Sequence, residues 1–405
     1  MSQVTENLSP VKQCYRAIRF SGLLADTNNA WYMIFSVYHM VMINYIGVAA
    51  VLEILLKERN LLDFVQALSV IVIYVHDIVK AVNIFTHQKG VKQLLNRLEE
   101  FIQETAKNEP NQSRKRSFRE TFISIYIKIL IWLPSLSLVC GVFGDYMTGF
   151  VKPHLPYQIW IPWSLKEFWP YMAGMVFVTM LEFTTCVYYM SFTVINFTFS
   201  NELSSSLRRL QERLETKGPA DKTVYEHHNA IIQLLLDYNQ LFSGPLYVET
   251  LMSSLMPCGF FYLFIKIVKS FDPLAFELIL KAIMCAGAPY VVCSCVGQEI
   301  SDQMEQLHRS AYASNWCEEP PRIRKNLLTL MIITTKRIDL NYRKFVSFNH
   351  VCLATVTNSK NVYFPEMEMR QRSQSLAGFK LKKKILKKNT DFKERFVGGG
   401  WRNQP

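Results

Sequence analysis

Residues 326–364 read NLLTLMIITTKRIDLNYRKFVSFNHVCLATVTNSKNVYF, and their polarity decides how this chain can fold. The segment is apolar from Leu327 to Ile333, carries charges between Lys336 and Asp339, and continues to Phe364 with many polar side chains. A charge such as that of Lys360 costs roughly 2.5 to 3.5 kcal/mol at the centre of a bilayer. The segment is therefore either a broken membrane helix whose second half is covered by protein and water, or an irregular segment outside the membrane.

Further apolar runs of membrane-span length precede this segment. They lie at residues 31–56, 61–85, 122–146, 168–199, 247–268 and 274–296. About 20 apolar residues in a helix cross the hydrocarbon core of a bilayer, and soluble cores rarely need so many such runs. The sequence therefore predicts an all-α, polytopic membrane protein with seven transmembrane helices, the last of them broken into two halves.

The charges of the connecting segments predict the orientation. Lys and Arg total twenty in the N-terminal segment and in residues 86–121, 201–248 and 301–325, but only six in the alternate loops. Because positive residues accumulate on the cytoplasmic side, the N-terminus is expected to be cytoplasmic. This orientation is opposite to that of a G-protein-coupled receptor. We expect a cytoplasmic segment at 1–30 and a seven-helix domain at 31–364.

The last part of the chain, residues 365–405, differs in composition from the rest. Residues 370–405 carry eleven Lys or Arg and two acidic residues, which accounts for most of the net charge of +12. Such a run is more typical of a solvated, disordered tail than of a nucleic-acid site. Because Pro365 ends the helix and the tail would lie outside, against the charge bias, we expect an altered final exon here.

Among the ionisable residues inside the predicted spans, two sets raise the question of a functional role. His76, Asp77 and Lys80 lie near the inner end of the second span, where they could form a proton relay, but pairing with neighbouring helices is the simpler interpretation. Glu182 lies near the middle of the fourth span and needs a partner, for which we expect a structural hydrogen bond.

No catalytic chemistry is indicated. The sequence has no phosphate-binding loop and no nucleophile motif, and Cys293-Ser-Cys295 lacks the spacing of a metal site. We therefore expect no enzyme activity, no cofactor and no metal.

The connections carry structure of their own. The loop 147–166 is rich in proline and tryptophan, which predicts an ordered lid over the third and fourth spans. The fourth span keeps helical spacing through Leu214, a break follows at Gly218-Pro219, and a further helix is expected from Val224 through Leu241.

The region after Gly297 carries a family resemblance. The stretches Gly297–Ile300, Ala311-Tyr312, Asn315-Trp316 and Pro321-Arg322, with the leucine-rich run that follows, resemble insect odorant receptors. With the topology, the resemblance covers about residues 12–364. The signature of the sister gustatory receptors is not visible.

This resemblance implies a subunit of a ligand-gated, non-selective cation channel in the plasma membrane of an olfactory neuron dendrite. Four subunits would meet through the second half of the last helix, and an obligate co-receptor would be the partner of this chain. A small volatile ligand would bind in the outer halves of the helices. The implied ligand-binding residues are Tyr74, Cys140, Gly141, Gly144, Tyr171, Met175, Thr179, Tyr262 and Phe276. The pore would be lined by His350, Thr357 and Asn361, which share one helical stripe.

Other functions remain open from the sequence. A chemoreceptor of the G-protein-coupled or gustatory type would also have seven spans, but the former would place its N-terminus outside. A transporter would show internal repeats and charged pairs in mid-membrane.

Overall fold

The computed structural model describes most of the first 357 residues. The described ranges are 10–23, 29–56, 61–108, 118–147, 155, 159–267, 296–314, 316–335, 340–343 and 346–357. The predicted tail 365–405 and most of the predicted sixth span, 274–296, lie outside these ranges.

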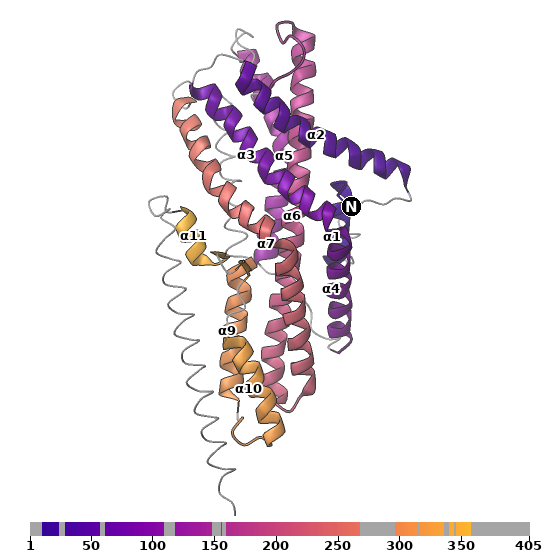
Figure 1. Ribbon diagram of the computed structural model, residues 1–405, viewed down its shortest axis with the longest axis vertical. Coiled ribbons are helices and arrows are strands. Elements are labelled where there is room, and N and C mark those ends of the chain that lie inside the picture. The colour runs from indigo at the N-terminus through magenta and orange to yellow at the C-terminus, as the bar shows by residue number, and fades with distance from the viewer. Residues whose placement is uncertain are drawn as a thin grey trace, which may run out of the picture. The chain divides into compact units, whose positions relative to one another are not determined.

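The described part of the chain is almost entirely helical (Figure 1). Its helices are α1 (Pro10–Phe20), α2 (Ala30–Leu56), α3 (Leu61–Thr86), α4 (Gln88–Asn108), α5 (Phe118–Met147), α6 (Phe168–Lys217), α7 (Lys222–Ile267), α9 (Glu299–Ala313), α10 (Pro321–Thr335) and α11 (His350–Thr357). The strands β1 (Asn341–Tyr342) and β2 (Val346–Ser347) pair antiparallel as a short hairpin. The all-α fold class predicted from the apolar runs is confirmed.

Three described helical segments are long and apolar enough to cross a membrane. They are Ala30–Leu56, Gln66–Thr86 and the apolar part of Phe168–Lys217. On α2, large apolar side chains such as Trp31, Val41 and Leu55 are exposed while the opposite face is buried. A helix that is apolar on its exposed face is typical of contact with lipid.

The helices α6 and α7 are far longer than a membrane span. They contain 50 and 46 residues, and a 50-residue helix is about 75 Å long at 1.5 Å per residue. Helix α6 ends at Lys217 and is followed by Gly218 at φ 75°, as the predicted break requires. The expected helix from Val224 to Leu241 and the fifth span are one continuous helix, α7, and not two.

Most buried apolar side chains belong to two clusters. The large cluster joins α1, α4, α9 and α10 to α6 and α7, with Phe199 stacked on Tyr238 at 4.2 Å between ring centroids. The Tyr238 hydroxyl also donates a 2.6 Å hydrogen bond to Asn196 Oδ1. Figure 1 shows α9 and α10 beside the α6–α7 pair, as their mutual contacts require. The small cluster lies at the other end of α6 and is described below with the site.

The segment after α10 differs from the sequence-based expectation. We expected a helix to resume at Phe345, but Val346 and Ser347 form β2 and helix α11 begins at His350. The cause is tertiary: Phe348 is buried, and its N–H donates to the Leu340 carbonyl at 2.9 Å, which turns the chain back on itself. The break of the last helix into two parts is thus confirmed, with a hairpin between α10 and α11.

Candidate ligand-binding site

The small cluster brings together several of the predicted ligand-binding residues. On α6, Tyr171 and Met175 are 2 % and 0 % exposed. Their four-residue spacing places them on the same face of the helix, and this face is buried. The members of the cluster come from α2, α3, α6 and the loop before α6. They are Met42, Ile46, Ala49, Ala50, Val70, Leu155, Ile159, Ile161, Tyr171, Met175, Val178 and Leu181.

Tyr74 forms the border of this cluster on α3. Its ring packs against both the small and the large cluster, and its hydroxyl donates to Asn44 Oδ1 at 3.3 Å. The ring lies directly on Gly47 of α2, where an added Cβ would come within 2.6 Å of a ring carbon. The helices α2 and α3 therefore approach closely at this point because residue 47 has no side chain.

The loop before α6 covers the small cluster. The Trp160 N–H donates to the Ala49 carbonyl at 3.1 Å, and the Tyr45 hydroxyl donates to the Trp160 carbonyl at 3.0 Å. Leu165 lies so close to Gly174 that an added Cβ would be 2.9 Å from its Cδ2. The described part of this loop is thus ordered, as predicted, and it is attached to the fourth span, α6, and also to the first span, α2.

The other predicted ligand-binding residues have different positions. Thr179 is half-buried on α6, and its hydroxyl donates to the Met175 carbonyl at 2.8 Å. Cys140, Gly141 and Gly144 lie on α5 and Tyr262 lies on α7, but their surroundings and Phe276 are outside the described part of the chain. Leu138 and Val142, which flank Cys140 and Gly141 on α5, do pack against the small cluster.

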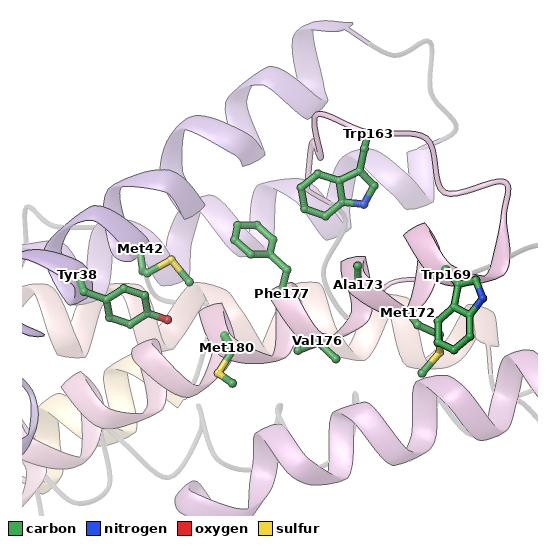
Figure 2. A pocket seen from close by; sticks show the side chains of 9 residues that line it. All are labelled: Tyr38, Met42, Trp163, Trp169, Met172, Ala173, Val176, Phe177 and Met180. Carbon is green, nitrogen blue, oxygen red and sulfur yellow. The ribbon is translucent and has the colours of Figure 1, made fainter.

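An apolar groove of about 700 Å³ runs along the neighbouring face of α6 (Figure 2). Ligand sites for small molecules have volumes of this order and mostly apolar linings. The groove is lined by Tyr38, Met42, Trp163, Trp169, Met172, Ala173, Val176, Phe177 and Met180.

Three lining residues belong to both the groove and the small cluster. Met42 is a buried member of the cluster, and Met172 and Phe177 pack against it. The Phe177 ring makes edge-to-face contacts with Tyr45 at 5.2 Å and with Trp163 at 5.7 Å between centroids. These three side chains are therefore the wall between the groove and the buried residues Tyr171 and Met175.

Sequence reasoning missed this wall. The groove residues Met172, Val176 and Met180 are each one position after the predicted Tyr171, Met175 and Thr179, which on a helix means a rotation of about 100°. The sequence also has no local signal that Met42 of α2 and Phe177 of α6 line the same groove.

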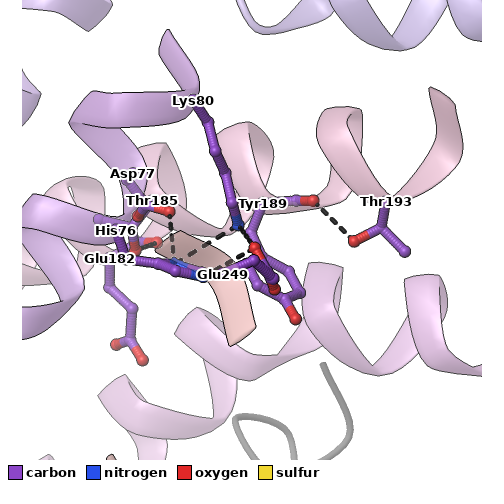
Figure 3. Close-up of polar contacts among 8 residues, drawn as sticks. All are labelled: His76, Asp77, Lys80, Glu182, Thr185, Tyr189, Thr193 and Glu249. Atoms are coloured by element: carbon purple, nitrogen blue, oxygen red, sulfur yellow. Dashed lines mark hydrogen bonds and ion pairs between the residues drawn. The ribbon is translucent and has the colours of Figure 1, made fainter. Parts of the chain in front are cut away.

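Glu182 and the charged trio of α3 have partners, as we expected. The Ser137 hydroxyl of α5 donates to Glu182 Oε1 at 2.9 Å, and both residues are buried. His76 Nε2 and Lys80 Nζ lie 2.8 Å and 2.5 Å from Glu249 Oε2 of α7 (Figure 3). The expected pairing of His76 and Lys80 with a neighbouring helix is thus confirmed, and its partner Glu249 was not foreseen.

Of the predicted pore residues, only one has a described side chain. His350 is the exposed first residue of α11, and its N–H donates to Gln298 Oε1 at 3.2 Å. Thr357 ends α11, its side chain lies outside the described residues, and so does all of Asn361. The pore assignment remains a prediction.

These features define the class of the protein: a polytopic α-helical membrane protein with an apolar groove of small-molecule size at one end of its longest helix. Comparison with known proteins gives the family. A profile of the 7tm Odorant receptor family matches residues 60–359, and the chain belongs to this family.

Curated relatives have the same family name. The chain is 23 % identical over 318 residues to odorant receptor 85b of Drosophila melanogaster. This match covers 74 % of this chain and 80 % of the relative. It is 25 % identical over 350 residues to the putative odorant receptor 85d of the same fly. This match covers 79 % of this chain and 81 % of the relative. The family is one of chemoreceptors and not of enzymes.

Solved structures show the same fold. The olfactory receptor OR5 from Machilis hrabei superposes with a TM-score of 0.71 at 13 % identity, and its complex with eugenol superposes with a TM-score of 0.72 at 14 % identity. Both matches cover 87 % of this chain and 96 % of the other. The chain is therefore a membrane-spanning odorant receptor with the seven-helix fold of this family.

Proposed function

We propose that this odorant receptor is the ligand-recognising subunit of a ligand-gated, non-selective cation channel. It would act with a co-receptor subunit, in a hetero-tetramer, in the plasma membrane of an olfactory neuron dendrite. Family membership and the fold of the insect olfactory receptors support this proposal.

The ligand would bind at the end of α6 that begins at Phe168, which by the charge distribution is the extracellular half. One observation carries this assignment. Met42, Met172 and Phe177 line the apolar groove and also belong to, or pack against, the small cluster. Methionine is flexible and polarisable, so this wall can adapt to a small guest. We therefore place the ligand between Phe177 and the buried pair Tyr171 and Met175.

The chemistry of the lining suggests the class of ligand. Apart from the Tyr38 hydroxyl and the indole N–H groups of Trp163 and Trp169, the groove is built of apolar and thioether groups, and the Trp163 N–H already donates to the Pro170 carbonyl at 3.0 Å. Such a site favours small, mostly apolar volatiles with at most one or two hydrogen-bonding groups. The remaining predicted residues, Tyr74, Thr179, Cys140, Gly141, Gly144, Tyr262 and Phe276, would complete the site from α3, α5, α6, α7 and the sixth span.

Co-expression in oocytes with and without a co-receptor subunit tests the proposal. Whole-cell current is recorded while a panel of apolar volatiles is applied. We expect an odorant-evoked current that reverses near 0 mV in mixed Na⁺ and K⁺ and that needs both subunits. The absence of current for every volatile, with both subunits shown at the surface, would refute the channel assignment.

A further inference from the structure

Four ionisable side chains are buried together where α3 crosses α7. His76, Asp77, Lys80 and Glu249 are between 1 % and 4 % exposed, and we call them the ionic cluster. One carboxylate oxygen, Glu249 Oε2, forms ion pairs with both Lys80 Nζ at 2.5 Å and His76 Nε2 at 2.8 Å. Asp77 Oδ1 lies 3.4 Å from His76 Nδ1 on the other side of the imidazole (Figure 3).

Helix α6 closes the ionic cluster with aromatic rings. Lys80 Nζ lies 4.2 Å from the ring centroid of Tyr189 and 4.9 Å from that of Phe192. The His76 imidazole stacks on Tyr189 at 5.6 Å with an interplanar angle of 29°. Lys80 is thus surrounded by a carboxylate, an imidazole and two π faces instead of water, and Glu249 is the carboxylate that pairs with its charge.

The ionic cluster begins next to the proposed ligand site. Tyr74, which borders the small cluster, precedes His76 by two residues and Lys80 by six on α3. At 1.5 Å per residue, Lys80 is about 9 Å along the helix axis from Tyr74. Tyr74 and two members of the ionic cluster therefore lie on consecutive turns of the same helix, α3.

On α7, the ionic cluster is connected to the segment that leads into α11. Tyr247, two residues before Glu249, stacks on Tyr342 of β1 at 4.7 Å with an interplanar angle of 10°. The Asn341 N–H donates to Asn239 Oδ1 of α7 at 3.0 Å. The hairpin before the proposed pore helix is thus held by the same helix that carries Glu249.

We propose that Glu249, bound by Lys80 and His76, is a positioning residue that couples the ligand site to α11. The ionic cluster is formed in the conformation in which Tyr171 and Met175 are fully packed. A ligand can enter between Phe177 and this buried pair only if these side chains move, so the ionic cluster stabilises the packed conformation against the liganded one. This inference depends on the proposed channel function.

The test uses the full chain with its co-receptor and measures basal current, EC50 and maximal evoked current per surface receptor. For Glu249→Gln we expect an EC50 about tenfold lower and a higher basal current, within the range of allosteric couplings. The matched control is Arg97→Gln, which breaks an exposed pair between α4 and α7, Arg97–Asp237 at 2.5 Å. We expect this control to change the EC50 less than about twofold.

A second variant avoids the loss of a buried charge. Tyr247→Leu removes the stacking on Tyr342 from a partly exposed position, and we expect a lower maximal current per surface receptor. An unchanged maximal current for Tyr247→Leu would overturn the proposal even if Glu249→Gln failed to reach the surface. An unchanged or higher EC50 of surface-expressed Glu249→Gln would overturn it as well. If the wild type gave no odorant-evoked current, the channel assignment itself would fail, which is a separate result.

Discussion

The carbonyl oxygen of Phe348 lies against the α-carbon of Gly297, at the point where the segment before α11 passes the start of α9. A side chain at position 297 would overlap this backbone atom. Gly297 begins the region in which the sequence resembles the family most specifically. The glycine is therefore required by a close approach of two backbones, which holds Phe348, between the hairpin and α11, against the start of α9.

Gly297→Ala should consequently destabilise the receptor. The obstacle is backbone and not the end of a flexible side chain, so we expect a loss of about 1 to 3 kcal/mol in the free energy of unfolding, as for other overpacked sites. The matched control is Gly244→Ala in α7, where an added Cβ would have Tyr342 at a comfortable 3.9 Å. The measurement is the melting temperature of each detergent-solubilised variant, which should be lower for Gly297→Ala than for Gly244→Ala. Equal melting temperatures for the two variants would contradict this explanation of Gly297.

Gly47→Ala should change ligand recognition. The new Cβ would lie within 2.6 Å of the Tyr74 ring, so the ring must shift, and we expect it to shift towards the small cluster. Because this shift reduces the space beside Tyr171 and Met175, we expect a rise of about tenfold in the EC50 of the bulkier volatiles, or about 1.4 kcal/mol. Tyr74→Phe, which removes only the hydroxyl bonded to Asn44, is the control and should change the EC50 less than threefold. A normal EC50 for Gly47→Ala would place the ligand elsewhere.

His228 should make the stability of the α6–α7 layer depend on pH. Burial lowers the pKa of its imidazole to about 4, and it lies in the part of α7 predicted to be cytoplasmic. As the pH is lowered, the imidazole takes up a proton near pH 6.5 in the unfolded chain but only near pH 4 in the folded chain. The stabilisation is thus complete above about pH 6.5 and is lost as pH falls towards 4, by roughly 3 kcal/mol.

Melting temperatures between pH 7.5 and 4.5 check this prediction. His228→Gln should flatten the decrease, while His87→Gln, at an exposed position, should leave it as in the wild type. If both variants lost stability as steeply as the wild type, His228 would not be the cause.

The membrane helices were predictable because burial in lipid leaves a continuous apolar run. The run 31–56 became α2 (Ala30–Leu56) and the run 61–85 became α3 (Leu61–Thr86). Helix spacing also placed Tyr171 and Met175 on one face, and both are buried in the small cluster. These features depend on local pattern alone.

The rest depends on contacts between distant parts of the chain. Glu249 is 169 positions after Lys80 and has no local signal of its pairing. The hairpin replaced the first turns of an expected helix because Phe348 bonds to Leu340 and packs on Gly297. The wall residue Phe177 was missed because α6 is apolar on several faces, so hydrophobicity did not show which face meets α2.

The most direct test of the account is the odorant dose–response of Phe177→Ala beside the wild type, each with the co-receptor. Phe177 lines the groove and packs on the small cluster, so loss of its ring should raise the EC50 about tenfold at equal surface expression. Phe85→Ala, an exposed phenylalanine of α3 away from the site, is the matched control and should have a wild-type EC50. An unchanged EC50 for Phe177→Ala, with wild-type currents, would contradict the proposed site.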